Sequence, residues 1–145
     1  VPVFCGVGGG LTNGIRSASM AAYVEHQGAY GVVCNSKIGL ETIHDIKDAV
    51  EIPVVYTVIS EKTDIQPYLD AGVDIINVSG AARTPEIVAA LRARYPELAI
   101  IATGGPTEES ILSTIQAGAN AITYTPPSSA SLFAKTMADN RSELE

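Results

Sequence analysis

Six short apolar runs, rich in valine and isoleucine, are the feature of this 145-residue sequence that most restricts its fold. They begin roughly 24 residues apart, which is the spacing of a minimal strand–helix unit. The runs cover residues 1–7, 31–35, 53–59, 74–79, 98–103 and 121–125. Each is short enough for a strand, and its apolar side chains at successive positions allow both faces to be buried. Such runs are typical of a parallel sheet that is covered by helices.

The segments between the runs have features of helices, including apolar side chains three and four residues apart. They are residues 17–26, 40–50, 64–71, 84–94, 107–117 and 128–140. Thr84, followed by Pro85, is the predicted N-cap of one helix, and Thr107 opens the next. Because strands that alternate with helices form parallel sheets with right-handed crossovers, we predict an α/β fold.

Proline and glycine mark a longer period. Prolines introduce the first, third and fifth runs, at Pro2, Pro53 and Pro96, and glycines introduce the others, at Gly28, Gly72 and Gly118. A glycine just past a helix fits the left-handed conformation that ends many helices. The three glycines lie 44 and 46 residues apart, so the chain is interpreted as three strand–helix–strand–helix doublets.

Eight-stranded barrels are often built from such doublets, because alternate strands fill alternate layers of the interior. We therefore predict that residues 1–145 form a single (β/α)-repeat domain, a TIM-type barrel in which six βα units are visible. Three doublets are one short of eight strands, so we expect a missing doublet on the N-terminal side. The alternative is an open, doubly wound parallel sheet.

Composition argues against several classes of partner. The net charge is −7 and the nine Lys and Arg residues are scattered, whereas nucleic-acid binding needs a basic face. The apolar runs are too short to span a bilayer and no targeting stretch is visible, so we expect a cytoplasmic protein without a membrane partner. Cys5 and Cys34 are interpreted as buried thiols within strands, and neither a metal nor a cofactor is expected.

In either architecture, the functional site lies beyond the carboxyl ends of the strands. The strongest candidate there is Thr103-Gly104-Gly105, which closes a strand directly before a helix. Bare backbone N–H groups and the helix dipole would attract a phosphate, and glycine would let it approach the backbone closely. The other interpretation of the two glycines is a tight strand–helix turn without a ligand.

Residues 100–125 resemble the penultimate strand, helix and last strand of the ribulose-phosphate-binding barrel superfamily. That group includes 2-keto-3-deoxy-6-phosphogluconate aldolases and N-acetylmannosamine-6-phosphate epimerases. The shared pattern is a strand that ends in Gly-Gly, a helix, an Ala-Gly-Ala-like turn and a final strand. Residues 53–76 resemble the same group.

The resemblance implies where a ligand binds and what happens to it. A phosphate would be held by Gly104 and Gly105 together with the loop formed by Thr123, Tyr124 and Thr125. The leading hypothesis is an enzyme of lyase or isomerase type that binds and converts a small phosphorylated or carboxylated metabolite at this face.

The catalytic groups of such an enzyme are not obvious. Schiff-base aldolases of this group carry a lysine on a core strand, and the nearest lysine here is Lys37, just past the second strand. Epimerases need an acid–base pair, for which the loop residue Glu61 is the candidate. A solvated lysine and an exposed loop carboxylate are the alternative interpretations.

Further ligand contacts are expected from uncharged residues at strand ends, namely Gly8, Gly9, Asn35, Asn77 and Ser79. Glycines after the first strand could cradle a second anion, and polar uncharged side chains suit binding better than proton transfer. The alternative function is therefore a ligand-sensing regulatory barrel similar to the glycerol-operon antiterminators. Because open barrel edges associate readily, a homo-oligomer is also expected.

Overall fold

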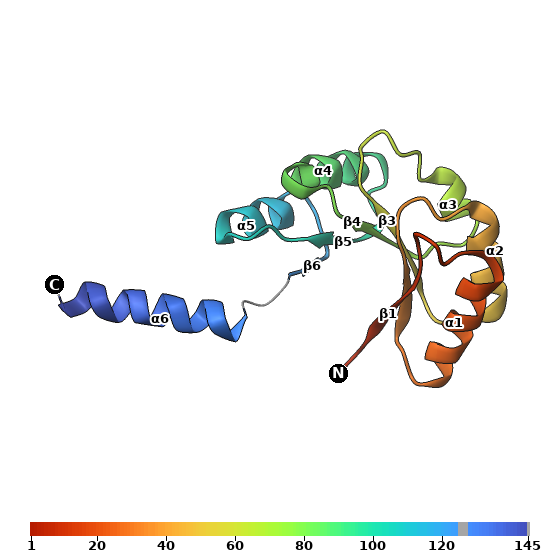
Figure 1. Cartoon of the computed structure of the whole chain (residues 1–145). Helices are drawn as coiled ribbons and strands as arrows, with labels where there is room; N and C mark the ends of the chain where they lie inside the picture. Colours follow the sequence, from red (N-terminus) through yellow and green to blue (C-terminus); the bar gives the residue numbers. More distant parts are fainter. Residues whose placement is uncertain (125–127, 145) are drawn as a thin grey trace.

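The computed structural model describes residues 1–124 and 128–144 (Figure 1). Its strands are β1 (Phe4–Gly8), β2 (Gly31–Cys34), β3 (Val54–Val58), β4 (Ile75–Val78), β5 (Ala99–Thr103) and β6 (Ala121–Thr123). Its helices are α1 (Gly14–His26), α2 (Leu40–Ala49), α3 (Gln66–Asp70), α4 (Thr84–Arg94), α5 (Glu108–Gln116) and α6 (Ser129–Leu144), with a short 3₁₀ turn, η1 (Ala81–Arg83), before α4. Every predicted strand and helix is therefore present, with ends that differ by a few residues.

The six strands form one sheet in the order β1-β2-β3-β4-β5-β6, and all neighbouring pairs are parallel. A doubly wound sheet reverses its strand order, so that alternative is wrong. The sheet curls, and the helices α1 to α5 cover its convex side (Figure 1). This arrangement is part of a TIM-type barrel, as predicted.

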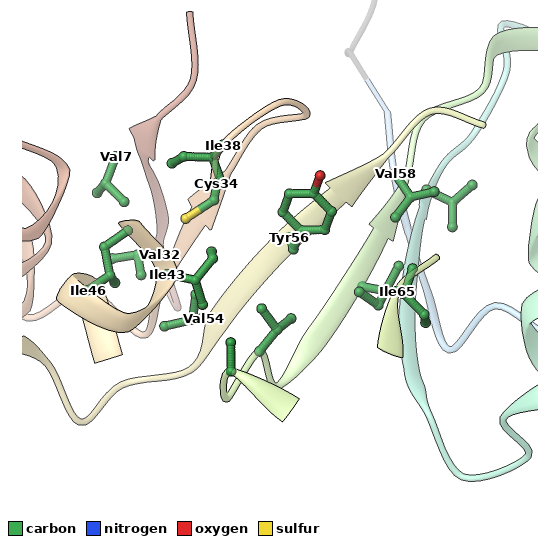
Figure 2. Packing of buried hydrophobic residues seen from close by; sticks show 14 of the residues in the cluster. Val7, Val32, Cys34, Ile38, Ile43, Ile46, Val54, Tyr56, Val58 and Ile65 are labelled. Atoms are coloured by element: carbon green, nitrogen blue, oxygen red, sulfur yellow. The ribbon is translucent and has the colours of Figure 1, made fainter. Parts of the chain in front are cut away.

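The core lies between the convex side of the sheet and the helices (Figure 2). The outward side chains of the strands are almost fully buried there, among them Val32, Cys34, Val54, Tyr56, Val58, Ile76, Val78, Ile100 and Ala102. Helix residues such as Ile43 and Ile46 of α2 and Ile87 of α4 pack against them. Burying each side chain of this size stabilises the fold by about 1.5–3 kcal/mol, which explains the valine and isoleucine runs.

The first residues of α5 and α4 show how the local sequence determines where a helix begins. Thr107 caps α5 as a capping box, because its hydroxyl accepts from Ser110 N while Ser110 Oγ accepts from Thr107 N. Thr84 does not cap α4, in contrast to our prediction. It is the first helical residue, and its hydroxyl accepts from Gly80 N at 2.9 Å, because η1 precedes the helix directly.

The doublet period appears at the amino ends of the strands. Gly72 and Gly118 adopt the left-handed conformation predicted for them, with φ of 105° and 112°. A Cβ at Gly72 would lie 3.1 Å from Lys47 Cε, and one at Gly118 would lie 2.9 Å from Arg92 Cγ. The side chain of Lys47 thus packs against Gly72, and that of Arg92 packs against Gly118.

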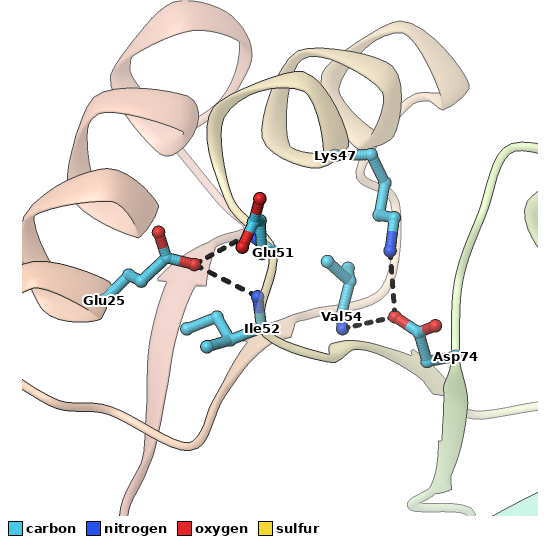
Figure 3. Close-up of polar contacts among 6 residues, drawn as sticks. All are labelled: Glu25, Lys47, Glu51, Ile52, Val54 and Asp74. Carbon is cyan, nitrogen blue, oxygen red and sulfur yellow. Dashed lines mark hydrogen bonds and ion pairs between the residues drawn. The ribbon is translucent and has the colours of Figure 1, made fainter.

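The same cations reach a polar residue two positions after each glycine. Asp74 Oδ2 accepts from Lys47 Nζ at 3.1 Å and from Val54 N at 2.8 Å (Figure 3). In the next doublet, Asn120 Oδ1 accepts from Arg92 Nη2 at 2.7 Å and from Ile100 N at 2.9 Å. Each contact ties a helix end to the start of two neighbouring strands, and we call these two contacts the strand-start clamps.

The first doublet uses a different carboxylate at this end. Glu25 Oε2, at the end of α1, accepts from Glu51 N at 2.7 Å and from Ile52 N at 3.0 Å (Figure 3). These backbone amides lie in the turn that leads into β3. Side-chain oxygens thus hold the amino ends of the strands in place. In TIM barrels this end of the strands contributes to stability, whereas the carboxyl ends form the active site.

Helix α6 extends away from the curled sheet in Figure 1. Its side chains Leu132, Phe133 and Met137 are exposed, and so are Leu112 and Ile115 on α5. Among the residues that the structure describes, no helix combines the length and the hydropathy needed to cross a membrane.

The strand-start clamp at Asp74 predicts a graded loss of stability. Asp74→Ala should lower the free energy of unfolding by about 1–3 kcal/mol, because the part-buried Val54 amide loses its acceptor. Asp74→Asn should cost less than half of that, since asparagine serves at the equivalent position, Asn120. Urea unfolding of the two variants measures the difference, and equal losses would contradict the proposed role of the oxygen acceptor.

Candidate functional site

Gly104 and Gly105 follow Thr103 at the carboxyl end of β5. Close packing explains why both positions are glycine. A Cβ at Gly104 would lie 2.8 Å from Ile122 Cγ2 and 2.9 Å from Ile111 Cγ1. A Cβ at Gly105 would lie 2.7 Å from Ser110 Cβ. Since real Cβ atoms do not approach so closely, the turn requires glycine for packing alone, whether or not it binds a ligand.

The backbone amides of this turn are not equivalent. Gly104 N donates to the carbonyl of Thr123 at 2.8 Å, so it belongs to the pairing of β5 with β6. Within the described part of the chain, Gly105 N and the first amides of α5, at Glu108 and Glu109, have no protein acceptor. An anion at this turn would therefore meet Gly105 N and the start of α5 rather than Gly104 N.

A cavity of about 670 Å³ opens beside the turn. Its lining includes Thr103, Gly104, Gly105, Glu108, Tyr124 and Lys135. Lys135 belongs to α6 and is the one basic residue among the described residues that line this cavity, whereas Glu108 is acidic. Lys135 was not among the predicted site residues, because nothing in the spacing of the sequence shows that α6 and the end of β5 line one cavity.

A second cavity, of about 540 Å³, lies against the same turn and is bounded by the start of α4. Ser79, Thr84, Ser113 and Thr114 line it together with residues 103–106. Ser79 is thereby brought next to the Thr103–Gly105 turn, as its place at a strand end predicts. The described lining is uncharged and combines hydroxyl side chains with apolar residues such as Ala81, Ala82 and Pro85.

A third cavity, of about 280 Å³, lies on the concave side of the sheet, which is the interior of the barrel. Its lining residues are Phe4, Val33, Val55, Asn77, Ile101 and Thr123. Two of the predicted contacts, Asn77 and Thr123, thus face the interior rather than the mouth. The predicted contact Thr125 lies outside the described residues.

Gly8 ends β1 and Gly9 follows it, so both lie at the opposite edge of the sheet from β6. Asn35 N donates to Gly8 O at 3.0 Å, and Gly9 exchanges backbone hydrogen bonds with Thr12 at 2.9 and 3.1 Å. A Cβ at Gly9 would lie 2.7 Å from Asn35 Cβ, and the φ of Gly9 is 127°. These residues line none of the three cavities, so the structure does not bring them to the Thr103–Gly105 turn.

Lys37 occupies an exposed, left-handed position with a φ of 74°. Next to this loop, the rings of Tyr56 and Tyr68 are stacked, with their centroids 3.9 Å apart. Tyr68 also donates its hydroxyl to Ile38 O at 3.1 Å. The structure therefore fixes the loop but leaves the Lys37 side chain without the burial that a Schiff-base lysine uses.

Glu61 is tied to a neighbouring loop. It forms an ion pair with Arg83 at 2.7 Å, and Arg83 Nε also lies 3.2 Å from Glu86. The Glu61 hydrogen bond, followed by that of Glu86, raises the pKa of Arg83 above its usual value. The pair joins the loops after β3 and β4, and both side chains are exposed.

Neither the Cys34 thiol nor a metal site provides an alternative centre in the described part of the chain. Burial raises the pKa of the Cys34 thiol to about 12, so that it stays protonated and unreactive near neutral pH. In residues 1–124 and 128–144, no three His, Cys, Asp or Glu side chains are close enough together to hold a metal ion. The three cavities therefore define the candidate site.

The Cys34 thiol predicts a specific alkaline instability. Unfolded chains lose this proton near pH 9, whereas the folded chain keeps it until about pH 12. The stabilisation is complete below pH 9 and disappears between these values, by about 1–3 kcal/mol at pH 11. Urea unfolding from pH 8 to 11 should show a steeper decline for the wild type than for Cys34→Ala, and parallel curves would refute the assignment.

The strand order, the outer helices and the cavities at the carboxyl ends define the class of this molecule as a partial TIM-type barrel. No family model matches the sequence. A protein of Shouchella clausii (strain KSM-K16), named as an N-acetylmannosamine-6-phosphate 2-epimerase, is 30% identical over 109 residues, which cover 63% of this chain and 47% of that protein. The chain thus spans about half the length of the curated relative it matches.

Solved structures share the fold. A protein from Burkholderia cenocepacia J2315, described as a phosphonomutase, matches all of this chain and 70% of its own, with a TM-score of 0.69 and 18% identity. The native KDPGal structure matches 82% of this chain and 54% of its own, with a TM-score of 0.61 and 21% identity. Mandelate oxidase with benzoyl-formic acid matches 76% of this chain and 45% of its own, with a TM-score of 0.59 and 16% identity.

These matches confirm the resemblance predicted from residues 53–76 and 100–125. The chain has the TIM-type fold and resembles barrels of the N-acetylmannosamine-6-phosphate epimerase and KDPGal kind.

Proposed function

We propose that this protein binds a small phosphorylated metabolite at the carboxyl ends of β5 and β6 and converts it in a reaction of lyase or isomerase type. The observation that carries the proposal is the 670 Å³ cavity at the Gly105 turn. Gly105, whose backbone amide has no acceptor among the described residues, lines this cavity together with Glu108 at the start of α5 and with Lys135 of α6. Amide donors at a helix start together with a nearby cation are what an anionic phosphate needs.

The relatives support the same class of ligand. The Shouchella clausii protein is named for N-acetylmannosamine-6-phosphate, which carries a phosphate on a sugar. The Burkholderia cenocepacia protein is described as a phosphonomutase. No antiterminator is among the relatives described above, so a purely sensing role has no support from them.

The catalytic groups of the proposed reaction remain the two candidates from the sequence. Glu61 can serve as acid or base at the same end of the sheet, with Arg83 holding its carboxylate in place. Lys37 lies two strand ends away from β4, in a fixed loop. Neither residue lines one of the three cavities, and of the two only Glu61 is held by an ion pair with a neighbouring loop in the described part of the chain.

The role of Lys135 can be tested directly. Lys135→Gln should weaken the binding of inorganic phosphate about fivefold, because it removes one charge-assisted contact worth about 1 kcal/mol. Titration followed by NMR chemical shifts of the Gly105 amide measures both the affinity and the place of binding.

The matched control is Arg141→Gln, which removes a positive charge from an exposed position of the same helix. It should leave the affinity within a factor of two. If phosphate shifts no resonance of Gly105 or of the start of α5, the proposed phosphate site is wrong.

We also propose that the protein self-associates through its exposed apolar helix faces. Phe133 on α6 is 69% exposed, and Leu112 and Ile115 on α5 are exposed nearby in sequence. Within residues 1–124 and 128–144, the edge strands β1 and β6 each pair with a strand on one side only. Exposed apolar patches and open sheet edges are surfaces that proteins usually cover.

Sedimentation velocity tests this association. The wild type should sediment as a dimer or larger species, and Phe133→Asp should weaken self-association at least tenfold by placing a charge in the apolar face. Ser131→Asp adds the same charge to α6 and should have little effect. A wild type that stays monomeric at every concentration would contradict the proposal.

A further inference from the structure

The dipeptide Asn13-Gly14 joins the loop after β1 to α1, and the proposed function makes no use of it. An asparagine side chain can be attacked at Cγ by the backbone nitrogen of the next residue, which closes a succinimide ring. Glycine favours this reaction more than any other residue, because it has no Cβ to obstruct the approach of its own nitrogen. Asn13-Gly14 is the one such dipeptide in the sequence.

The structure leaves the Asn13 side chain available for this reaction. Asn13 is exposed and is the N-cap residue of α1, with an extended backbone at φ −151° and ψ 179°. Asparagine is a preferred N-cap because its side-chain oxygen accepts from a helix amide. Within the described part of the chain, however, the Asn13 side chain makes no capping hydrogen bond. The carboxamide is therefore not fastened to the start of its own helix.

The backbone nitrogen of Gly14, in contrast, is held by another helix. Gly14 N donates to Thr42 Oγ1 at 2.9 Å, and Thr42 belongs to α2 and is 6% exposed. The helices α1 and α2 are neighbours on the convex side of the sheet (Figure 1). Attack on Asn13 Cγ requires the proton to leave Gly14 N and the nitrogen to turn towards Cγ. The hydrogen bond to Thr42 opposes both steps.

We infer that Asn13 is a site of spontaneous deamidation and that the Thr42 hydroxyl, through Gly14 N, sets the rate. Hydroxide removes the proton from Gly14 N, the nitrogen bonds to Asn13 Cγ, and the bond from Cγ to the side-chain nitrogen breaks. That nitrogen takes a proton from water and leaves as ammonia. A second water molecule then opens the succinimide at one of its two carbonyl groups, which gives aspartate or isoaspartate. The inference does not rest on the proposed function.

The modification would alter the loop at the carboxyl end of β1. Both products replace a neutral carboxamide with a carboxylate, which adds one negative charge to the net charge of −7. An aspartate at this position would face the positive end of the α1 dipole, which stabilises it. Isoaspartate would instead add a methylene group to the backbone directly before α1. The two products therefore have different consequences for the start of the helix.

Mass spectrometry of the full chain tests the inference. The folded wild type and the wild type unfolded in guanidinium chloride are incubated at the same mildly alkaline pH, and the conversion of Asn13 is followed over time. The unfolded chain should deamidate Asn13 at least about tenfold faster, because in the folded chain the bond to Thr42 must first open. Thr42→Val keeps the side-chain shape and should raise the folded rate about fivefold, as the loss of one hydrogen bond predicts.

Three comparisons separate the hydroxyl of Thr42 from general changes in stability. Thr42→Ser retains the hydroxyl and should keep the wild-type rate. Thr57→Val is the matched control, because it removes an equally buried hydroxyl from β3, and it should leave the rate at Asn13 unchanged. Asn140 on α6 serves as an internal reference, and its own rate should be the same in every folded variant.

Hydrogen exchange of the wild type gives a measurement that needs no variant. Gly14, Ile15 and Arg16 supply the first amides of α1, which have no acceptor within the helix itself. Among these three, only Gly14 N has an acceptor in the described part of the chain, namely Thr42 Oγ1. The Gly14 amide should therefore exchange at least about tenfold more slowly than those of Ile15 and Arg16, after correction for their intrinsic rates.

Each contrary outcome overturns a defined part of the inference. An unfolded chain that keeps Asn13 intact overturns the site itself. A folded wild type that deamidates Asn13 as fast as the unfolded chain overturns the protection by the fold. A folded Thr42→Val with the wild-type rate overturns the role of Thr42. If Thr42→Val does not fold, a Gly14 amide that exchanges as fast as those of Ile15 and Arg16 overturns that role instead.

Discussion

The burial of outward-facing valine and isoleucine side chains beneath the helices is the interaction on which the whole structure depends. It determines which face of each strand meets a helix, and therefore which residues are left for the concave side. Because side chains alternate along a strand, placing Val54, Tyr56 and Val58 outside places Val55 and Thr57 inside. The polar residues of the interior are thus consequences of the outer packing as much as of their own chemistry.

The two ends of the sheet divide stability and function between them. At the amino ends, Asp74 and Asn120 accept hydrogen bonds from the strand amides of Val54 and Ile100. At the carboxyl ends, the amides of Gly105 and of the start of α5 remain without protein acceptors. A residue can therefore be altered at one end without direct consequences at the other.

Much of the fold could be predicted from the sequence, because its signals are local. Short valine- and isoleucine-rich runs, helical spacing and glycines such as Gly72 and Gly118 each act within one strand–helix unit. The N-cap at Thr84 was predicted wrongly, because the 3₁₀ turn before it depends on how the loop packs. Local signals were therefore sufficient to predict the strands and helices, but not the exact residues at which they begin and end.

The candidate site was less predictable, because its geometry depends on contacts between distant segments. The Gly104–Gly105 turn was found from its place before a helix, yet the use of Gly104 N by Thr123 could not be read from either segment alone. The same holds for Lys135, which reaches the turn from α6, and for the register that pairs Asn77 with Thr57. A single sequence contains no direct signal for such register.

The bond between Gly104 N and the carbonyl of Thr123 couples the last strand to the turn. β6 has three residues, is the shortest of the described strands and lies at the edge of the described sheet. Local opening of β6 would release Gly104 and disturb the neighbouring Gly105 amide. A ligand bound at this turn would therefore stabilise the edge strand β6 against local unfolding. Hydrogen exchange would then slow more in β6 than in the central strands.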